Sequence, residues 1–177
     1  MHRVFAGCVS IVGLLAVSSL ACAQELVIDW EEVRVFVFVD DAVTDIARQA
    51  ADVVERTSDY SLVVVGATAG SLEQRLESEP TDVIFMAAPA IDALEQASRF
   101  VPGTRVDVAR ASLGDGQPPT IYSAAMMATG ENSEGARVFL RALVSEEGRA
   151  AATAAGLEPI GIPREGPAAA PPSVSSL

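Results

Sequence analysis

Short apolar runs alternate with amphipathic segments through the first half of the chain. Three runs are typical of strands buried on both faces: residues 33–39, 61–65 and 82–86. Apolar residues recur at helical spacing after each run, as at Val43, Ile46 and Ala50. A β-α-β-α-β-α order of this kind predicts a parallel sheet with helices on both faces.

The second half predicts two more strands and two more helices. Strands are expected over residues 105–111 and 120–128, joined by a turn-rich connector containing Asp115-Gly116 that predicts a hairpin. Helices are expected over 132–144 and 146–155, the second ended by Gly156. We therefore predict an α/β fold, a three-layer αβα sandwich around a mostly parallel five-stranded sheet. It would form a single domain over residues 24–162, followed by a disordered Pro/Ala/Ser-rich tail over 163–177.

The first 23 residues have the organisation of a cleavable signal peptide. His2 and Arg3 precede an apolar run from Val4 to Leu20, and Ala21-Cys22-Ala23 supplies small residues for cleavage. A membrane anchor is the other interpretation, but 17 residues interrupted by glycine and serine are short for a span. We expect no lipid anchor at Cys22, because Ser19 stands where a branched aliphatic residue is usual. The sequence thus predicts a periplasmic protein.

Cys8, Cys22 and His2 are the chain's only cysteines and histidine, and all three lie in this first segment. The mature chain is therefore expected to have no disulfide, no thiol nucleophile, no imidazole base and no His/Cys metal site. These absences disfavour an enzyme, and we expect neither a cofactor nor a bound metal.

The chain is strongly acidic. Its twelve basic residues are all arginines, and they stand against 24 acidic residues, for a formal net charge of −12. Such a chain repels nucleic acid phosphates and anionic lipid headgroups, so neither is an expected partner.

The candidate site lies in the loops that follow the first two strands. A small-residue turn at a helix N-terminus leaves backbone N–H groups unpaired, and ligands of open parallel sheets bind outside the carboxyl ends of the strands. The predicted ligand-binding residues follow Val39 in one loop and Ala67 in the other: Asp40, Asp41, Ala42, Thr68, Ala69, Gly70 and Ser71.

Each of these residues also has a structural interpretation. An aspartate at 40 or 41 could N-cap the helix expected over 42–56. Thr68 or Ser71 could cap the next helix, since Ser71 and Gln74 have capping-box spacing.

Two other sets of residues allow chemistry in principle. Asp40, Asp41 and Asp82 could form an acid/base group in a hydrolase. Met126 and Met127 could bind a soft metal, although strand methionines usually belong to the core.

The chain resembles the molybdate-binding and related extracellular solute-binding proteins of ABC transporters. The resemblance covers most of residues 33–160 and is carried by the order of these segments: 37–45, 66–72, 79–83, 101–107, 121–125 and 136–159. It implies a type II periplasmic binding fold of two lobes that grip a small oxyanion with hydroxyls and backbone amides. This chain keeps the end segments and lacks the middle, so the resemblance implies a single lobe.

The resemblance also bears on individual residues and on function. Thr68, Ala69 and Gly70 match the second ligand loop, Ala42 stands where the first loop usually offers a hydroxyl, and Tyr122 aligns with the hinge crossing. It implies a periplasmic protein that binds a small polar solute, an oxyanion or another, for an ABC permease. The alternative is an interaction or structural module that has lost its ligand and docks another protein, or a second copy, through the face left by the missing lobe.

Overall fold

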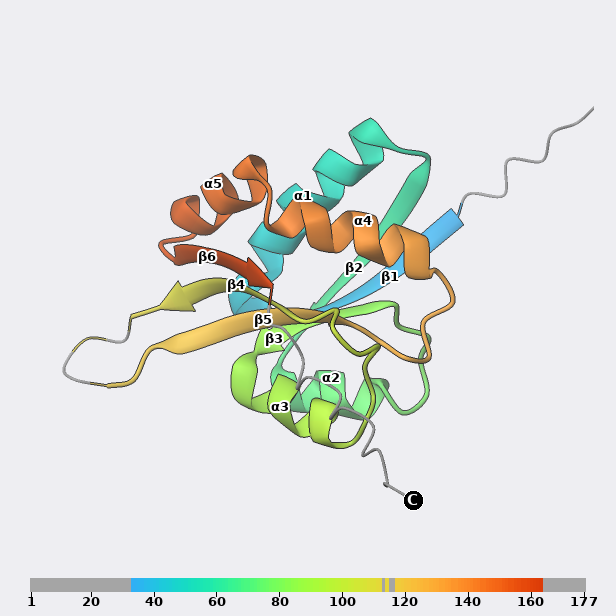
Figure 1. Ribbon diagram of the computed structural model, residues 1–177, viewed down its shortest axis with the longest axis horizontal. Coiled ribbons are helices and arrows are strands. Elements are labelled where there is room, and N and C mark those ends of the chain that lie inside the picture. The colour runs from blue at the N-terminus through green and yellow to red at the C-terminus, as the bar shows by residue number, and fades with distance from the viewer. Residues whose placement is uncertain (1–32, 113, 115–116, 164–177) are drawn as a thin grey trace, which may run out of the picture. The chain divides into compact units, whose positions relative to one another are not determined.

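The computed structural model describes residues 33–112, 114 and 117–163, which fall within one compact unit (Figure 1). The predicted signal peptide and residues 164–177 of the predicted tail lie outside these residues. The described elements follow in the order β1 (Val33–Asp40), η1 (Asp41–Val43), α1 (Thr44–Thr57), β2 (Tyr60–Ala67), α2 (Ala69–Arg75), β3 (Val83–Ala87), α3 (Ala88–Gln96), β4 (Val106–Ala111), β5 (Thr120–Met126), α4 (Ser133–Leu143), α5 (Glu146–Ala154) and β6 (Glu158–Pro163).

The predicted three-layer architecture is confirmed. Figure 1 shows α1, α4 and α5 on one face of the sheet and α2 and α3 on the other. Alternate residues of β1 point into two separate cores, since Val37 packs with the first helix group and Phe38 with the second. A strand covered on both faces must be apolar on both, which explains the nearly continuous hydrophobic run of β1.

The first three strands are parallel, as their alternation with helices predicts. β1 pairs with β2 without interruption from Val33 opposite Tyr60 to Asp40 opposite Ala67, and β3 pairs with the other side of β1. All their carboxyl ends therefore lie at the same edge of the sheet.

Two details of the predicted sheet are wrong. The sheet has six strands, in the order β2-β1-β3-β5-β4-β6, and three of its five pairings are antiparallel. The sixth strand, Glu158–Pro163, pairs with β4 and includes the residue at which we expected the tail to begin. Its two prolines and one glycine are unusual in a strand, so the sequence did not predict it. An edge strand can contain proline because one side of its backbone has no partner strand.

The predicted hairpin is confirmed. β4 and β5 pair antiparallel from Val106 opposite Ala124 to Ala111 opposite Thr120, and the connector brings the chain straight back between them. The Gln117 N–H donates to the Gly114 carbonyl at 3.0 Å within this connector. The described strands thus close a single sheet, which corresponds to one lobe of the fold that the resemblance implies.

Asp82 joins the parallel half of the sheet to the antiparallel half. Its carboxylate is buried and accepts hydrogen bonds from the backbone N–H of Phe36 at 2.8 Å and of Asn132 at 2.7 Å. Its own N–H donates to the Phe36 carbonyl, and its carbonyl accepts from the Met127 N–H, both at 2.9 Å. A Cβ at Gly130 would lie 2.9 Å from the Asp82 Cα, so only glycine fits beside it. Four segments therefore meet at this residue.

We predict that Asp82→Ala lowers the free energy of unfolding by about 3 kcal/mol, because two buried N–H groups lose a charged acceptor. Urea denaturation followed by circular dichroism measures the change. Asp45→Ala is the matched control, since the Asp45 side chain is 85% exposed and its nearest cation, on Arg48, is 4.0 Å away. Equal stability of the two variants would contradict the role given to Asp82.

Candidate functional site

The two predicted loops lie side by side at the carboxyl ends of β1 and β2. The last residue pair of these strands is Asp40 opposite Ala67, and each loop starts directly afterwards. Asp41, Ala42, Thr68, Gly70 and Ser71 are exposed, whereas Asp40 and Ala69 are partly buried. The sequence thus located the residues of one continuous surface, open to solvent.

Asp40 has the capping role that was one of its two interpretations. Its carboxylate accepts from the Ala42 N–H at 3.0 Å and caps the short turn η1, which leads into α1. Asp41 follows in this turn, and its Oδ1 would lie 3.5 Å from a Cβ on Gly66 of β2. A side chain at Gly66 would also meet the Thr44 hydroxyl at 2.7 Å. Glycine at this position of β2 therefore leaves room for the Thr44 side chain, and the Asp41 carboxylate lies within ordinary contact distance of it.

The second loop does not form the capping box that its spacing suggested. Thr68 is the N-cap residue of α2 by backbone position, and its carbonyl accepts from the Leu72 N–H at 3.0 Å. Its hydroxyl makes no capping hydrogen bond, and Ser71 lies inside the helix rather than at its start. The first N–H groups of a helix have no partner within it, so these amides and the Thr68 hydroxyl share the same edge.

Tyr122 belongs to this edge of the sheet, although sequence reasoning placed it only at the hinge crossing. β5 runs antiparallel to β3 and sets Tyr122 opposite Ala87, the last residue of β3. Burial raises the pKa of the Tyr122 phenol, and the negative charge of Asp40 raises it further. The predicted hairpin contained the signal for this position. If its second strand had been paired with the third predicted strand, Tyr122 would have fallen beside the loop that follows that strand.

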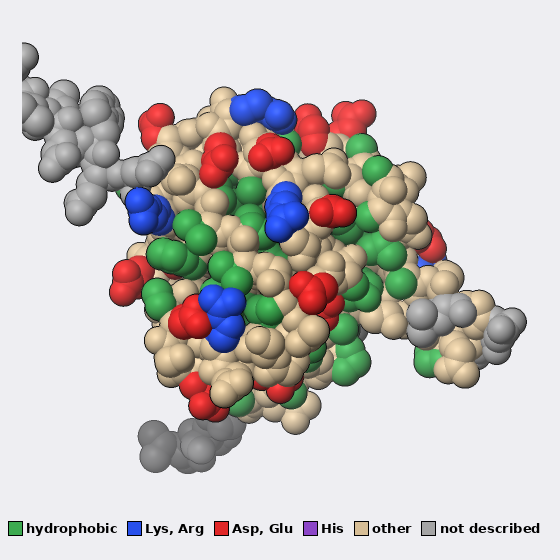
Figure 2. All heavy atoms as spheres, turned by 180° about the vertical axis from the view of Figure 1, so that it is seen from behind, with side chains coloured by type: hydrophobic (Ala, Val, Ile, Leu, Met, Phe, Trp, Pro, Cys, Tyr) green, Lys and Arg blue, Asp and Glu red, His purple; other side chains and the backbone are tan. Residues whose placement is uncertain are grey.

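The charge of the edge is negative. Neither loop contains a basic residue, and Arg75, at the far end of α2, already binds Glu79 through Nε at 2.7 Å and Nη2 at 2.6 Å. Arg75 also lies over the ring of Phe38, 5.0 Å from its centroid. On the face seen in Figure 2, basic side chains stand singly among acidic and hydrophobic ones.

Other candidate chemistry is not assembled. Asp82 lies next to the first residue of β3, at the opposite end of the parallel strands from Asp40, so the three aspartates do not form an acid/base group. Met126 and Met127 are buried in the two cores, as expected of strand methionines. Within the described ranges, no group of three or more Asp, Glu, His or Cys residues could hold a metal ion.

No helix in the part of the chain that the structure describes is long and apolar enough to cross a membrane.

Known structures with a similar arrangement include periplasmic solute-binding proteins. Iron-bound HitA from Pseudomonas aeruginosa is 10% identical, with a TM-score of 0.62, over 80% of this chain and 90% of that chain. The periplasmic molybdate-binding protein of Azotobacter vinelandii is 11% identical, with a TM-score of 0.58, over 70% and 98%. The sulfate-binding protein SubI from Mycobacterium tuberculosis is 11% identical, with a TM-score of 0.52, over 73% and 88%.

This chain has the same fold as these three proteins. Identities near 10% establish this fold alone, and the three proteins are named for ligands of opposite charge: iron, molybdate and sulfate. No protein-family model and no curated protein sequence matches the chain. The fold alone therefore does not determine the ligand.

We predict that the Tyr122 phenol ionises above the usual pKa of about 10, and that Asp40→Asn brings this pKa down. Ultraviolet absorbance during an alkaline titration follows the two tyrosines, and Tyr122→Phe identifies the signal of Tyr122. Because the folded-state pKa is raised, the stability that Tyr122 contributes is complete below about pH 10 and is lost as the pH rises through the folded-state pKa. An unchanged Tyr122 titration in Asp40→Asn would show that the two groups do not face each other.

Proposed function

We propose that this chain is a periplasmic solute-binding protein of one lobe, which holds a small polar solute for an ABC permease. The site consists of the two loops at the carboxyl ends of β1 and β2: Asp40, Asp41, Ala42, Thr68, Ala69, Gly70 and Ser71. The predicted signal peptide, cleaved after Ala23, would deliver the protein to the periplasm without a lipid on Cys22. The chain would act by binding, with no catalytic step.

One observation carries this proposal: the loops of a solute-binding fold meet at one edge of the sheet with uncommitted polar groups. Asp41 lies on the β2 side of its own loop, close to Gly66. The Thr68 hydroxyl and the first amides of α2 have no capping partner. Ligands of open parallel sheets bind at such an edge because the loops there are free to vary while the strands hold them in place.

The charges at this edge favour a neutral or cationic solute over a free oxyanion. A carboxylate about 4 Å from a bound anion costs about 4 kcal/mol at an effective dielectric constant of 20, which is about three decades of affinity. Asp40 and Asp41 would each repel an anion, and neither loop has an arginine to compensate. An amine or a polyhydroxylated solute could instead donate hydrogen bonds to the carboxylates, which are acceptors only.

The exposure of the loops supports a second candidate function. Most of the proposed ligand residues, including Asp41 and Thr68, are exposed and not enclosed by a second lobe. A small ligand gains most of its affinity from being largely enclosed. The same edge could therefore serve as an interaction surface for another protein or a second copy of the chain.

We predict that small organic amines and sugars raise the melting temperature at millimolar concentration, whereas molybdate and sulfate do not, because only ligands of the native state stabilise it. Thermal unfolding with each compound measures the effect, and isothermal titration calorimetry measures the affinity. Asp41→Asn should weaken binding of a cationic solute at least about tenfold, since it removes a charge in contact with the ligand.

Asp45→Asn is the matched control for this experiment. Asp45 stands four residues further along the same segment, and its side chain is 85% exposed. The same loss of affinity in both variants would indicate a general charge effect and exclude a specific contact. If no compound in the panel shifts the melting temperature and the protein forms a stable dimer in sizing chromatography, the results would contradict solute binding and support an interaction surface.

A further inference from the structure

The two edge strands of the sheet differ in how they are protected against pairing with another strand. β6 forms one edge, and it contains two prolines, a glycine and Glu158, which is paired with Arg110. β2 forms the other edge, and its sequence, YSLVVVGA, contains no charged residue and no proline. Prolines, charged side chains and bulges are the usual means by which proteins block a strand edge. The residues of β2 provide none of these, so its edge is open to another strand.

Every second residue of β2 points its backbone N–H and C=O groups away from β1. β1 is the only described strand that pairs with β2, and the pairing runs without a register shift. The Leu62 N–H donates to the Glu55 carboxylate of α1 at 2.8 Å, so Leu62 faces outward. Backbone groups alternate along a strand, and therefore Tyr60, Val64 and Gly66 face outward as well. Among the described residues, Glu55 is the only one that hydrogen-bonds to this outer side.

The side chains of β2 are only half covered on both faces of the sheet. Seven of its eight residues are partly buried and one is exposed, whereas β1 beside it is largely buried. Leu62 and Val64 pack against the core that contains Val37, and Val65 packs against the core that contains Phe38. A further strand beside β2 would continue both apolar layers and remove more of these side chains from water.

A second copy of the chain offers a matching strand. Two copies of β2 can run antiparallel about a two-fold axis at Val63. In this register Tyr60 lies opposite Gly66 of the other copy, and Leu62 lies opposite Val64 of the other copy. No other two-fold register pairs all four outward-facing residues within β2. Every cross-strand pair then joins uncharged side chains, and each contact occurs twice.

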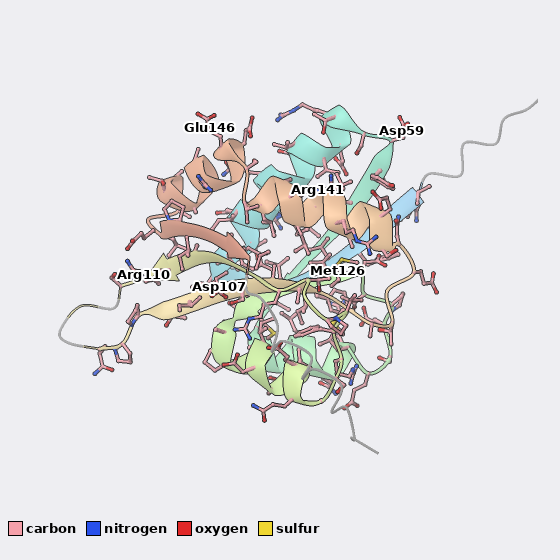
Figure 3. All side chains as sticks on the ribbon, viewed as in Figure 1. Asp59, Asp107, Arg110, Met126, Arg141 and Glu146 are labelled. Atoms are coloured by element: carbon pink, nitrogen blue, oxygen red, sulfur yellow. The ribbon has the colours of Figure 1, made fainter. Side chains whose placement is uncertain are left out.

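Charge also favours β2 as the place where two copies meet. The formal net charge of −12 makes two copies of the chain repel each other. β2 itself is uncharged, and the nearest acidic residue along the chain is Asp59, which Figure 3 labels at the turn between α1 and β2. In the antiparallel pair the two Asp59 residues lie at opposite ends, about 27 Å apart at a rise of about 3.4 Å per residue. This separation is well beyond the screening length of about 8 Å.

Glu55 is the obstacle on this edge. Its carboxylate occupies the Leu62 N–H, which pairing would transfer to the Val64 carbonyl of the other copy. The two Glu55 carboxylates would also approach each other across the axis, and like charges repel. Because the Glu55 side chain is exposed, it can turn toward solvent and release the strand. Glu55 therefore weakens the pairing and does not prevent it.

We propose that two copies of the chain pair through the outer edge of β2, antiparallel and with the two-fold axis at Val63, so that one continuous sheet crosses both copies. Glu55 sets the strength of this contact. The pairing uses residues 60–67 and leaves the loops of the proposed ligand site outside the paired strands. It is therefore independent of whether those loops bind a solute.

Cysteine cross-linking tests the contact and its register. Cys8→Ser and Cys22→Ser first remove the thiols of the full chain. Val63→Cys should then give a disulfide-linked dimer under mild oxidation, because the two positions face each other with Cα atoms about 4.5 Å apart, within the range of a disulfide. Val64→Cys and Val65→Cys are the matched controls. Their Cα atoms would be about 8 Å and about 14 Å from those of the other copy, beyond the 7 Å or so that a disulfide spans.

Sedimentation of a dilution series measures the dissociation constant of the dimer. Glu55→Ala should lower this constant at least about threefold, because it removes a competing acceptor and a repelling charge from the edge. Glu146→Ala is the control, since it removes one exposed carboxylate from α5, where Figure 3 labels it. It should leave the constant within about twofold, because a distant surface charge is screened.

Three results would overturn the proposal. The first is a native chain that stays monomeric at millimolar concentration. The second is equal cross-linking at all three valine positions, which random collision would give. The third is a dimer that forms no disulfide in Val63→Cys, because that would assign the association to another surface, such as the loops of the proposed ligand site. The reduced variants should all sediment as the native chain does, which shows that they fold.

Discussion

The carboxylate of Asp82 is the contact on which the arrangement of the sheet depends. The sheet changes from parallel to antiparallel pairing at β3, which pairs with β1 on one side and with β5 on the other. The end of β5 and the start of α4 both lie close to the first residue of β3. Asp82 ties β1, β3, the end of β5 and the start of α4 together through backbone groups, which side-chain substitutions other than proline leave in place. A buried charge is tolerated here because both of its oxygen atoms have a donor within 2.8 Å.

This junction lies at the opposite end of β3 from the two loops of the proposed ligand site. It lies at the amino end of β3, beside the middle of β1. The carboxyl ends of β1 and β2 lead into the two loops that contain Asp41, Thr68 and the first amides of α2. Rigid strands with variable loops at one edge are the general arrangement of α/β proteins for binding, and this edge is where the proposed site lies.

The sequence predicted elements well where one pattern decided the outcome. The continuous hydrophobic run of β1, the helical spacing after Asp41 and the connector between β4 and β5 each had one physical interpretation. β6 was not predictable, because its pairing depends on β4 and not on its own residues, Glu158-Pro159-Ile160-Gly161. The role of Asp82 was equally hidden, since an aspartate beside a strand carries no local sign of what it will meet across the sheet. The two loops lie together because strand ends in a parallel sheet share an edge by geometry, and the binding role of their residues stays a prediction.

The sign of the electric field at that edge follows from how the arginines are distributed. Arg75, Arg105 and Arg110 each bind carboxylates of neighbouring elements, so their charges are compensated locally. Arg75 is the basic residue of α2 and lies about 9 Å along the helix axis from Ala69 at a rise of 1.5 Å per residue. At physiological ionic strength the screening length is about 8 Å, so even an unpaired Arg75 would act only weakly on the loop. Asp40 and Asp41 therefore set the local potential, and a solute that binds there must either lack a negative charge or bring a cation with it.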